Sequence, residues 1–211
     1  MFKLKQKIQN NRGMTYVELI VVLGIFSVML SIALFNYKKF QGKVDIKNLA
    51  NDIALKLVES QKSSVSGKWN ASASSAWKPS YGVYLNSTTP TKIVYFADLN
   101  NSNSCDSANC TAPSYTIGGE VLDIVNITRG NTISSLQVYA PSGSGCTSPV
   151  TVTSISVAFK RPSSTPLPIT TSPASGCSSV SYYAINIVSN AASQAVTSQV
   201  KLYPSGRIQI N

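Results

Sequence analysis

The feature that most constrains this chain is an uncharged apolar run close to its start. The run Leu19–Phe35 follows a polar, basic segment, residues 1–13, and only Gly and Ser interrupt its apolar residues. With its flank it is close to the roughly 20 residues that a helix needs to span a bilayer. A single segment in lipid must pair its backbone groups internally, so we expect a transmembrane helix. The basic residues before the run are expected to hold the N-terminus in the cytoplasm while the remainder is translocated: Lys3, Lys5, Lys7 and Arg12.

One carboxylate stands at the entry to the apolar run. Glu18 is costly to bury in lipid without a partner, which marks it as a functional candidate. The alternative is that Glu18 lies at the membrane interface and stabilises the first helical turn, where negative charge suits the helix dipole. Taken alone, Glu18 favours this second interpretation.

The residues around Glu18 resemble the class III leader junction of type IV pilins and type II secretion pseudopilins: Gly13-Met-Thr-Tyr-Val-Glu18-Leu-Ile-Val-Val22. In that family Gly is the last leader residue and Glu is the fifth mature residue, and Gly13 and Glu18 match both positions. The resemblance implies that a prepilin peptidase cleaves between Gly13 and Met14 and that the new Met14 amine is methylated. It also implies that Glu18 pairs with the Met14 amine of a neighbouring subunit, and such pairing lowers the desolvation cost of each charge.

An ordinary secretory signal is the rival interpretation of this segment. Ser31-Ile-Ala33 offers the small residues that signal peptidase I requires, but the apolar run continues to Phe35 and is long for such a signal. Many major pilins also carry a helix-bending proline here, and residues 31–37 contain none. Within the family, the missing proline favours a minor subunit or a pseudopilin.

Beyond the apolar run, the sequence predicts that the helix continues. Apolar residues recur at three- and four-residue steps: Val44 or Ile46, Leu49, Ile53 and Leu57. We therefore expect one helix over about Thr15–Ser64, whose second half packs an apolar stripe against a sheet.

The rest of the chain predicts antiparallel β-structure. β-Branched or alternating segments bounded by turn residues define the expected strands: Tyr81–Leu85, Lys92–Ala97, Tyr115–Ile117, Val121–Thr128, Leu136–Tyr139, Ser154–Phe159, Ser181–Val188, Gln199–Tyr203 and Arg207–Ile210. Alternation such as that of Val200–Tyr203 suits strands with one face covered, here by the helix. The proline-rich stretch Arg161–Pro173 is expected to be an extended surface loop.

Several of these segments resemble the minor pseudopilins of the GspH/FimT type: Tyr81-Gly-Val-Tyr, Tyr95-Phe-Ala-Asp98-Leu-Asn, Val157-Ala-Phe-Lys-Arg-Pro162 and Leu202-Tyr-Pro-Ser-Gly-Arg-Ile208. The resemblance implies an α+β pilin fold, in which a long N-terminal helix packs on an antiparallel sheet. The expected organisation is a leader, a long helix, a linker and a β-rich head outside the cytoplasm: residues 1–13, 14–66, 67–80 and 81–211. Residues 14–36 would lie in the membrane or the filament core.

The cysteines predict disulfides in an exported domain. All of them follow the apolar run, and an even count in such a region is typical of disulfides: Cys105, Cys110, Cys146 and Cys177. Of the three pairings we favour Cys105–Cys110, which closes a short loop, and by elimination Cys146–Cys177. A four-cysteine zinc site is the competing interpretation, but the C-x4-C spacing and the scattered second pair are unusual for zinc.

One loop places oxygen side chains at nearly alternate positions: Asp98, Asn100, Ser102 and Asp106. Calcium takes about six to eight oxygens, and loops with such spacing can wrap it. Only two carboxylates are present here, and the Gly and terminal Glu of an EF-hand are missing. We therefore favour a polar turn closed by Cys105–Cys110 over a calcium site, and expect no cofactor.

Composition and resemblance together indicate assembly rather than catalysis. The chain contains no histidine, which excludes Ser-His-Asp triads and histidine metal sites, and it has no Gly-rich phosphate loop, so we expect no enzyme. The resemblance implies a structural, minor subunit of a type IV pilus or type II secretion pseudopilus. It would be a single-pass protein of the inner membrane before it joins a filament at the cell surface or in the periplasm. The implied partners are a prepilin peptidase, other pilins and the inner-membrane assembly platform.

Two alternative functions remain open at the level of sequence. The formal charge of +10 is compatible with a minor pilin that captures DNA during uptake, with these candidate contacts: Arg129, Lys160, Arg161 and Arg207. The other alternative is an adhesin, an exported β-domain that is simply anchored in the membrane.

Overall fold

The computed structural model describes residues 13–73, 78–110, 112, 114–170, 177–189 and 195–211, without the side chains of 35, 36, 38, 39, 169 and 170. The basic segment 1–12 and part of the predicted linker, 74–77, therefore lie outside the described residues. The chain divides into two units, Met1–Phe40 and Gln41–Asn211.

Helix α1 covers Tyr16–Val65, within one residue of the predicted range at either end. The Thr15 hydroxyl caps its start by accepting a hydrogen bond from the Glu18 N–H at 3.3 Å. At its other end Gly67 has φ +61°, and the N–H groups of Gly67 and Lys68 donate to the carbonyls of Ser64 and Ser63 at 3.0 Å each. This pattern is a Schellman motif, and a side chain at Gly67 would also collide with the Arg161 guanidinium.

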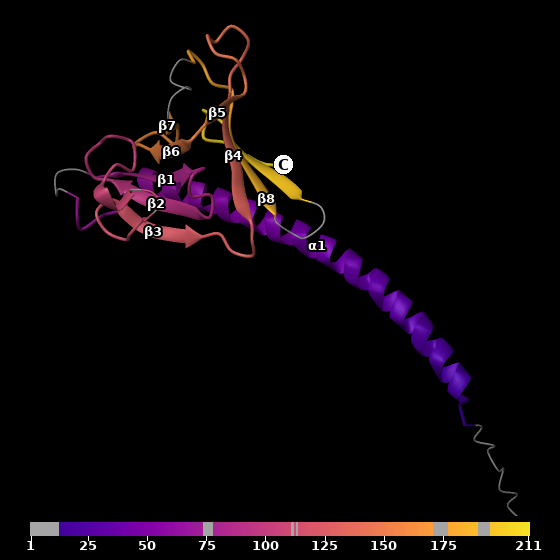
Figure 1. Cartoon of the computed structure of the whole chain (residues 1–211). Coiled ribbons are helices and arrows are strands. Elements are labelled where there is room, and N and C mark those ends of the chain that lie inside the picture. Colours follow the sequence, from indigo (N-terminus) through magenta and orange to yellow (C-terminus); the bar gives the residue numbers. More distant parts are fainter. Residues whose placement is uncertain (1–12, 74–77, 111, 113, 171–176, 190–194) are drawn as a thin grey trace, which may run out of the picture. The chain divides into compact units, whose positions relative to one another are not determined.

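Ten strands among the described residues form two five-stranded antiparallel sheets (Figure 1). The first sheet has the order β3-β2-β1-β6-β7: Val121–Asn126, Lys92–Asp98, Ser80–Asn86, Ser154–Phe159 and Pro166–Thr170. The second has the order β10-β9-β8-β4-β5: Ile208–Ile210, Val196–Leu202, Tyr182–Ser189, Thr132–Tyr139 and Val150–Val152. The expected class, α+β with antiparallel sheet, is confirmed.

Apart from shifted ends, such as β4 starting at Thr132 and β9 at Val196, the observed strands differ from the predicted ones in three places. Tyr115–Ile117 is not a strand, because Tyr115 is buried in a loop where its hydroxyl lies 2.8 Å from that of Thr89. Pro166–Thr170 is strand β7 inside the predicted proline-rich loop, of which residues 171–173 lie outside the described part. Prolines are tolerated there because β7 is an edge strand that pairs on one side only, with β6. Strand β5, Val150–Val152, was not predicted at all.

The second half of α1 supplies the core stripe that its periodicity predicts. Ile46, Leu49, Ile53 and Leu57 are all buried, whereas Val44 is 39% exposed, so the stripe starts at Ile46. These side chains belong to one buried cluster that also contains residues of both sheets. Two hydrogen bonds add to the packing: the Tyr81 N–H donates to the Ser64 hydroxyl at 2.7 Å, and the Tyr95 hydroxyl to that of Ser63 at 3.1 Å.

The first sheet is covered on both faces. Its outer face, which includes Val94, Phe96 and Ala158, is buried with Cys105, Cys110 and Tyr115 of the loop between β2 and β3. Phe96 lies directly over Gly82, where an added Cβ would come within 2.6 Å of its ring. The long loop thus acts as a third layer over the sheet.

Both disulfides have the favoured pairing. Cys105–Cys110 joins residues 5 positions apart and Cys146–Cys177 joins residues 31 positions apart, with Cα–Cα distances of 5.6 and 5.3 Å. These distances lie in the ordinary range for a disulfide. The first bond closes the loop over the first sheet, and the second ties the β4–β5 connection to the segment before β8.

We expect loss of the second disulfide to lower the free energy of unfolding more than loss of the first. Opening a loop of 31 positions restores about 3.7 kcal/mol of chain entropy to the unfolded state, and opening one of 5 positions about 2 kcal/mol. Urea unfolding of the Cys146→Ser/Cys177→Ser and Cys105→Ser/Cys110→Ser variants measures both. Equal losses would contradict this ranking.

Candidate functional site

The predicted cleavage junction precedes the first turn of α1. Gly13, Met14 and Thr15 are exposed and adopt no regular structure, and the helix begins at Tyr16. A protease can bind an exposed, extended backbone but not one inside a helix, since helical N–H and C=O groups are already paired. The Gly13–Met14 bond is therefore accessible, and Glu18 follows it within the first turn of the helix.

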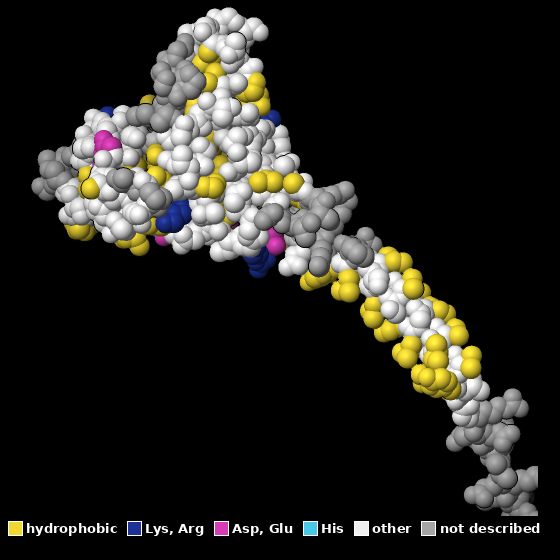
Figure 2. All heavy atoms as spheres, in the orientation of Figure 1, with side chains coloured by type: hydrophobic (Ala, Val, Ile, Leu, Met, Phe, Trp, Pro, Cys, Tyr) yellow, Lys and Arg dark blue, Asp and Glu magenta, His cyan; other side chains and the backbone are white. Residues whose placement is uncertain are grey.

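The first part of α1 is apolar on every side. Tyr16–Leu34 has 19 residues with a mean hydropathy of 2.6, and none of it is buried within the chain. Its large apolar side chains are between 45% and 78% exposed. Figure 2 shows hydrophobic side chains along this part of the helix. A helix that is apolar all round belongs in lipid or in a protein core. By length and composition this one can span a membrane.

Glu18 is the only charged residue of the apolar segment Tyr16–Leu34. Among the residues that the structure describes, the ion pairs are Lys56–Glu59, Lys56–Asp123 and Asp45–Arg129, and none involves Glu18. Its carboxylate is exposed beside apolar side chains that lipid or other helices would cover. A carboxylate covered by lipid or by apolar helices must either pair with a cation or be protonated, because an unpaired charge in a low-dielectric medium is strongly unfavourable.

The four cationic residues considered for DNA do not form one surface. Arg129 pairs with Asp45 of α1, whereas Arg161 lies against Gly67 just beyond the end of that helix. Asp45 and the helix end are roughly 30 Å apart at 1.5 Å per residue. Lys160 donates to the Asn101 side chain at 2.9 Å, and the Arg207 guanidinium lies 3.9 Å from the Tyr203 ring centroid.

The loop considered for calcium is organised around its own backbone. The buried Asp98 carboxylate accepts hydrogen bonds from the N–H groups of Ser102 and Asn103 at 3.0 Å each. Asn100 donates to the Asp106 carboxylate at 2.8 Å. These bonds use the oxygens that a cation would need, so the geometry favours the polar turn closed by the first disulfide.

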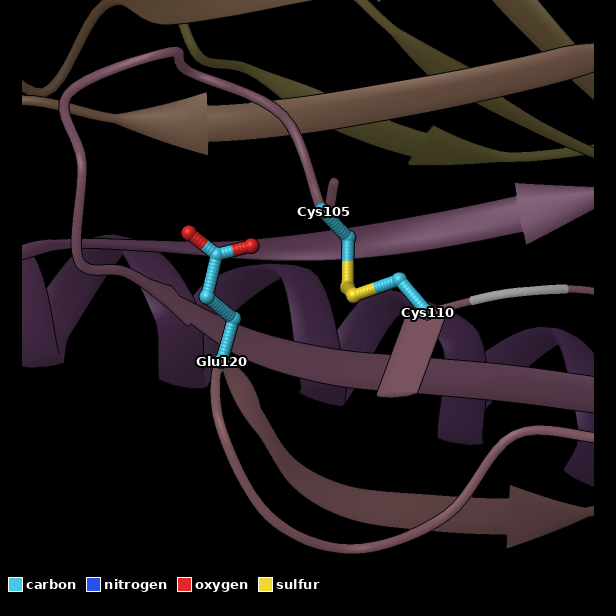
Figure 3. Close-up of side chains that lie close together, drawn as sticks. All are labelled: Cys105, Cys110 and Glu120. Atoms are coloured by element: carbon cyan, nitrogen blue, oxygen red, sulfur yellow. A yellow bond between two sulfur atoms is a disulfide. The ribbon is translucent and has the colours of Figure 1, made fainter. Parts of the chain in front are cut away.

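Glu120 completes this loop, and no local sequence pattern indicates its role. Its carboxylate accepts hydrogen bonds from the N–H groups of Leu99, Asp106 and Ser107 at 3.0–3.1 Å. Burial raises the pKa of Glu120; the three N–H groups oppose this shift, and the nearby Asp106 charge adds to it. Figure 3 shows Glu120 beside Cys105 and Cys110. Ligand atoms of these three residues lie within 4.8 Å of one another, but a disulfide sulfur is not a thiolate and does not bind metal in this form.

Replacing Glu120 with alanine is expected to destabilise the head by about 2–3 kcal/mol, because buried N–H groups would lose their acceptor. Urea unfolding of the full chain in micelles measures the change. Asp52→Ala is the control, since Asp52 is an exposed carboxylate of α1 outside this loop. A Glu120→Ala loss no larger than that of the control would show that Glu120 does not hold the loop.

The pH dependence of the free energy of unfolding gives a second test of the role of Glu120. Its raised pKa means that the folded state holds this proton to a higher pH than the unfolded state. Its contribution to stability is therefore fully present below the ordinary Glu pKa and is lost as the pH rises through the folded-state pKa. Glu120→Gln removes the titrating group, so we expect the free energy of unfolding of this variant to fall less as the pH rises.

Comparisons with models of protein families, with curated proteins and with solved structures return no match for this chain. Its function must therefore be inferred from its own residues.

Proposed function

We propose that this chain is a structural subunit, of the minor kind, in a type IV pilus or type II secretion pseudopilus. It is made as a precursor, cut by a prepilin peptidase between Gly13 and Met14, and methylated on the Met14 amine. Before assembly it is a single-pass protein of the inner membrane, with its β-rich head outside the cytoplasm. Other pilins and the inner-membrane assembly platform are its partners.

One arrangement carries this proposal: an exposed Gly–Met bond, a lone carboxylate one helical turn later, and an apolar helix with no further charge behind it. Gly13 and Met14 are exposed ahead of the helix, and Glu18 lies in its first turn. A simple membrane anchor needs the apolar residues but not the carboxylate. A secretory signal cut after Ala33 would discard both.

Assembly would follow from the same residues. Cleavage creates an amino group at Met14, four residues before Glu18. When the apolar helix of one subunit packs beside that of another, the Glu18 carboxylate of the incoming subunit can neutralise that amine. Each charge then lowers the desolvation cost of the other, so the subunits associate most favourably at one axial register.

The layout of the head supports a pilin fold of the GspH/FimT type, because the second half of α1 packs on antiparallel sheets. DNA capture is the weaker proposal, since Arg129 and Lys160 are already bonded to Asp45 and Asn101. An adhesin that is only anchored would need neither cleavage nor Glu18.

Recovery of the chain in filaments tests the proposal. Filaments sheared from cells that produce the whole assembly system are expected to contain the chain at substoichiometric amounts relative to the main subunit. Quantitative mass spectrometry of the sheared fraction measures the ratio. A chain that remains wholly in the membrane fraction, while filaments form, would contradict the proposal.

A further inference from the structure

A cavity of about 410 Å³ lies on the head beside α1 and is unrelated to the apolar segment. Its wall includes Lys56 and Glu59 of α1, Asp123 of β3, and Trp69 of the segment that follows α1. A volume of this size is within the range of pockets that bind small molecules. All of its wall lies within the unit Gln41–Asn211.

Trp69 is the most unusual residue of this cavity. It is 71% exposed, whereas the tyrosines of the same wall, Tyr81 and Tyr95, are almost fully buried. An exposed indole leaves a large apolar surface in water, and its contribution to the core is small. Exposed tryptophans beside polar groups are typical of binding sites, where the ring face receives an apolar surface of a ligand.

The wall of the cavity contains equal numbers of cationic and anionic side chains. Lys56 lies 3.1 Å from a Glu59 oxygen and 3.0 Å from an Asp123 oxygen. The Glu59 and Asp123 side chains are 42% and 48% exposed, so they keep oxygen lone pairs directed at the solvent. With Lys68 the wall holds two cations and two carboxylates, which gives it no net charge. Such a wall favours a neutral ligand that donates hydrogen bonds.

The two tyrosine rings of the wall are not available to a cationic ligand. The Lys56 ammonium lies 5.5 Å from the Tyr95 ring centroid, and that of Lys68 lies 6.0 Å from the Tyr81 centroid. Both rings therefore already have a cation over them. A quaternary ammonium group would have to displace a lysine or approach it at close range.

We propose that this cavity binds a pyranose unit of a neutral oligosaccharide. The C–H face of the sugar would lie on the Trp69 indole, and its hydroxyls would donate to the Glu59 and Asp123 carboxylates. The Lys56 ammonium would donate to a ring or hydroxyl oxygen. A pyranose combines an apolar face with a rim of hydroxyls, which matches one exposed aromatic ring beside two half-exposed carboxylates. This site does not depend on the proposed filament function.

The test uses the full chain in lipid nanodiscs, because alkyl-glycoside detergents would themselves compete. The probes are the neutral disaccharides cellobiose, maltose and N,N′-diacetylchitobiose. Saturation-transfer NMR measures the binding of each one to the chain. At least one is expected to bind with a dissociation constant on the order of 1–10 mM, as a small contact with few anchors allows. Trp69→Ala and Asp123→Asn are each expected to weaken that binding at least roughly tenfold.

Ile117→Ala is the matched control for Trp69→Ala, because Ile117 is also 71% exposed and does not line the cavity. It is expected to leave sugar binding unchanged. Absence of binding by all three disaccharides would overturn the proposal, as would binding that Trp69→Ala does not weaken. Equal or tighter binding of glucosamine, a cationic sugar, or of galacturonic acid, an anionic one, would overturn the neutral class.

Discussion

Replacing Glu18 with leucine is expected to remove the chain from filaments while leaving its processing and membrane insertion intact. The carboxylate is exposed on an apolar segment and has no cationic partner among the described residues. In a filament the Met14 amine of a neighbour would supply that partner, and its loss would leave the amine buried and unpaired. We expect the ratio of filament-bound to membrane-bound chain to fall by at least roughly tenfold, which corresponds to 1.4 kcal/mol.

Thr15→Ala is the matched control for this experiment. It removes the helix cap, whose hydroxyl accepts from the Glu18 N–H at 3.3 Å, but it leaves the carboxylate in place. Immunoblots of sheared and membrane fractions give the ratio for both variants. Normal incorporation of Glu18→Leu would show that the carboxylate does not direct assembly, and the interfacial cap would then be the better account of Glu18.

Leu57→Asp is expected to abolish the folded head. Leu57 is fully buried in the cluster where α1 meets both sheets. A carboxylate there would lack any partner, and the loss of apolar packing would add to its desolvation, for a total above about 5 kcal/mol. Such a loss approaches the whole stability of an ordinary domain. The measurement is limited proteolysis of the membrane-bound chain, in which the variant head is expected to be degraded.

Leu55→Asp is the control for Leu57→Asp, because Leu55 lies two positions away on the same helix and is 64% exposed. It is expected to resist proteolysis like the unmodified chain. Leu57→Ala is a milder substitution at the same position. It is expected to lower the free energy of unfolding by about 2–5 kcal/mol because of the cavity it creates. Equal protection of the two aspartate variants would mean that α1 does not pack on the sheets as described.

The parts of this fold that could be predicted are those with local, periodic signals. The stripe Ile46, Leu49, Ile53 and Leu57 follows the helical repeat, and the strand Ser154–Phe159 was predicted to the residue. The disulfide pairing could be predicted because one short spacing left only one other pair. Each of these signals lies within a few neighbouring residues.

The parts that could not be predicted depend on residues far apart in the sequence. The Glu120 carboxylate accepts hydrogen bonds from backbone N–H groups 13 to 21 positions away, and no sequence pattern around Glu120 indicates this role. The outer face of the first sheet is covered because Cys105, Cys110 and Tyr115 pack against Phe96, and alternation within one strand cannot reveal such a cover. Strand β7 was missed because prolines usually argue against a strand, and only its edge position tolerates them.

The cavity at Trp69 was missed for the same reason. Trp69 lies in a segment predicted to be only a linker, whereas Lys56 and Asp123 are 67 positions apart in the sequence. Lys56 and Glu59 are neighbours on α1, but only the packing of α1 beside β3 brings Asp123 to them. A signal was nevertheless present: tryptophan is costly to leave exposed, and this chain carries two in a short segment between its helix and its first strand.

Processing by a prepilin peptidase is tested by the intact mass and N-terminal sequence of the membrane-fraction protein, with and without a co-expressed prepilin peptidase. We expect a peptidase-dependent start at Met14, with a methyl-sized increase in mass where the peptidase also methylates. A start after Ala33, or an uncut Met1 in the presence of active peptidase, would contradict it. The chain would then be a secreted or simply anchored β-rich protein.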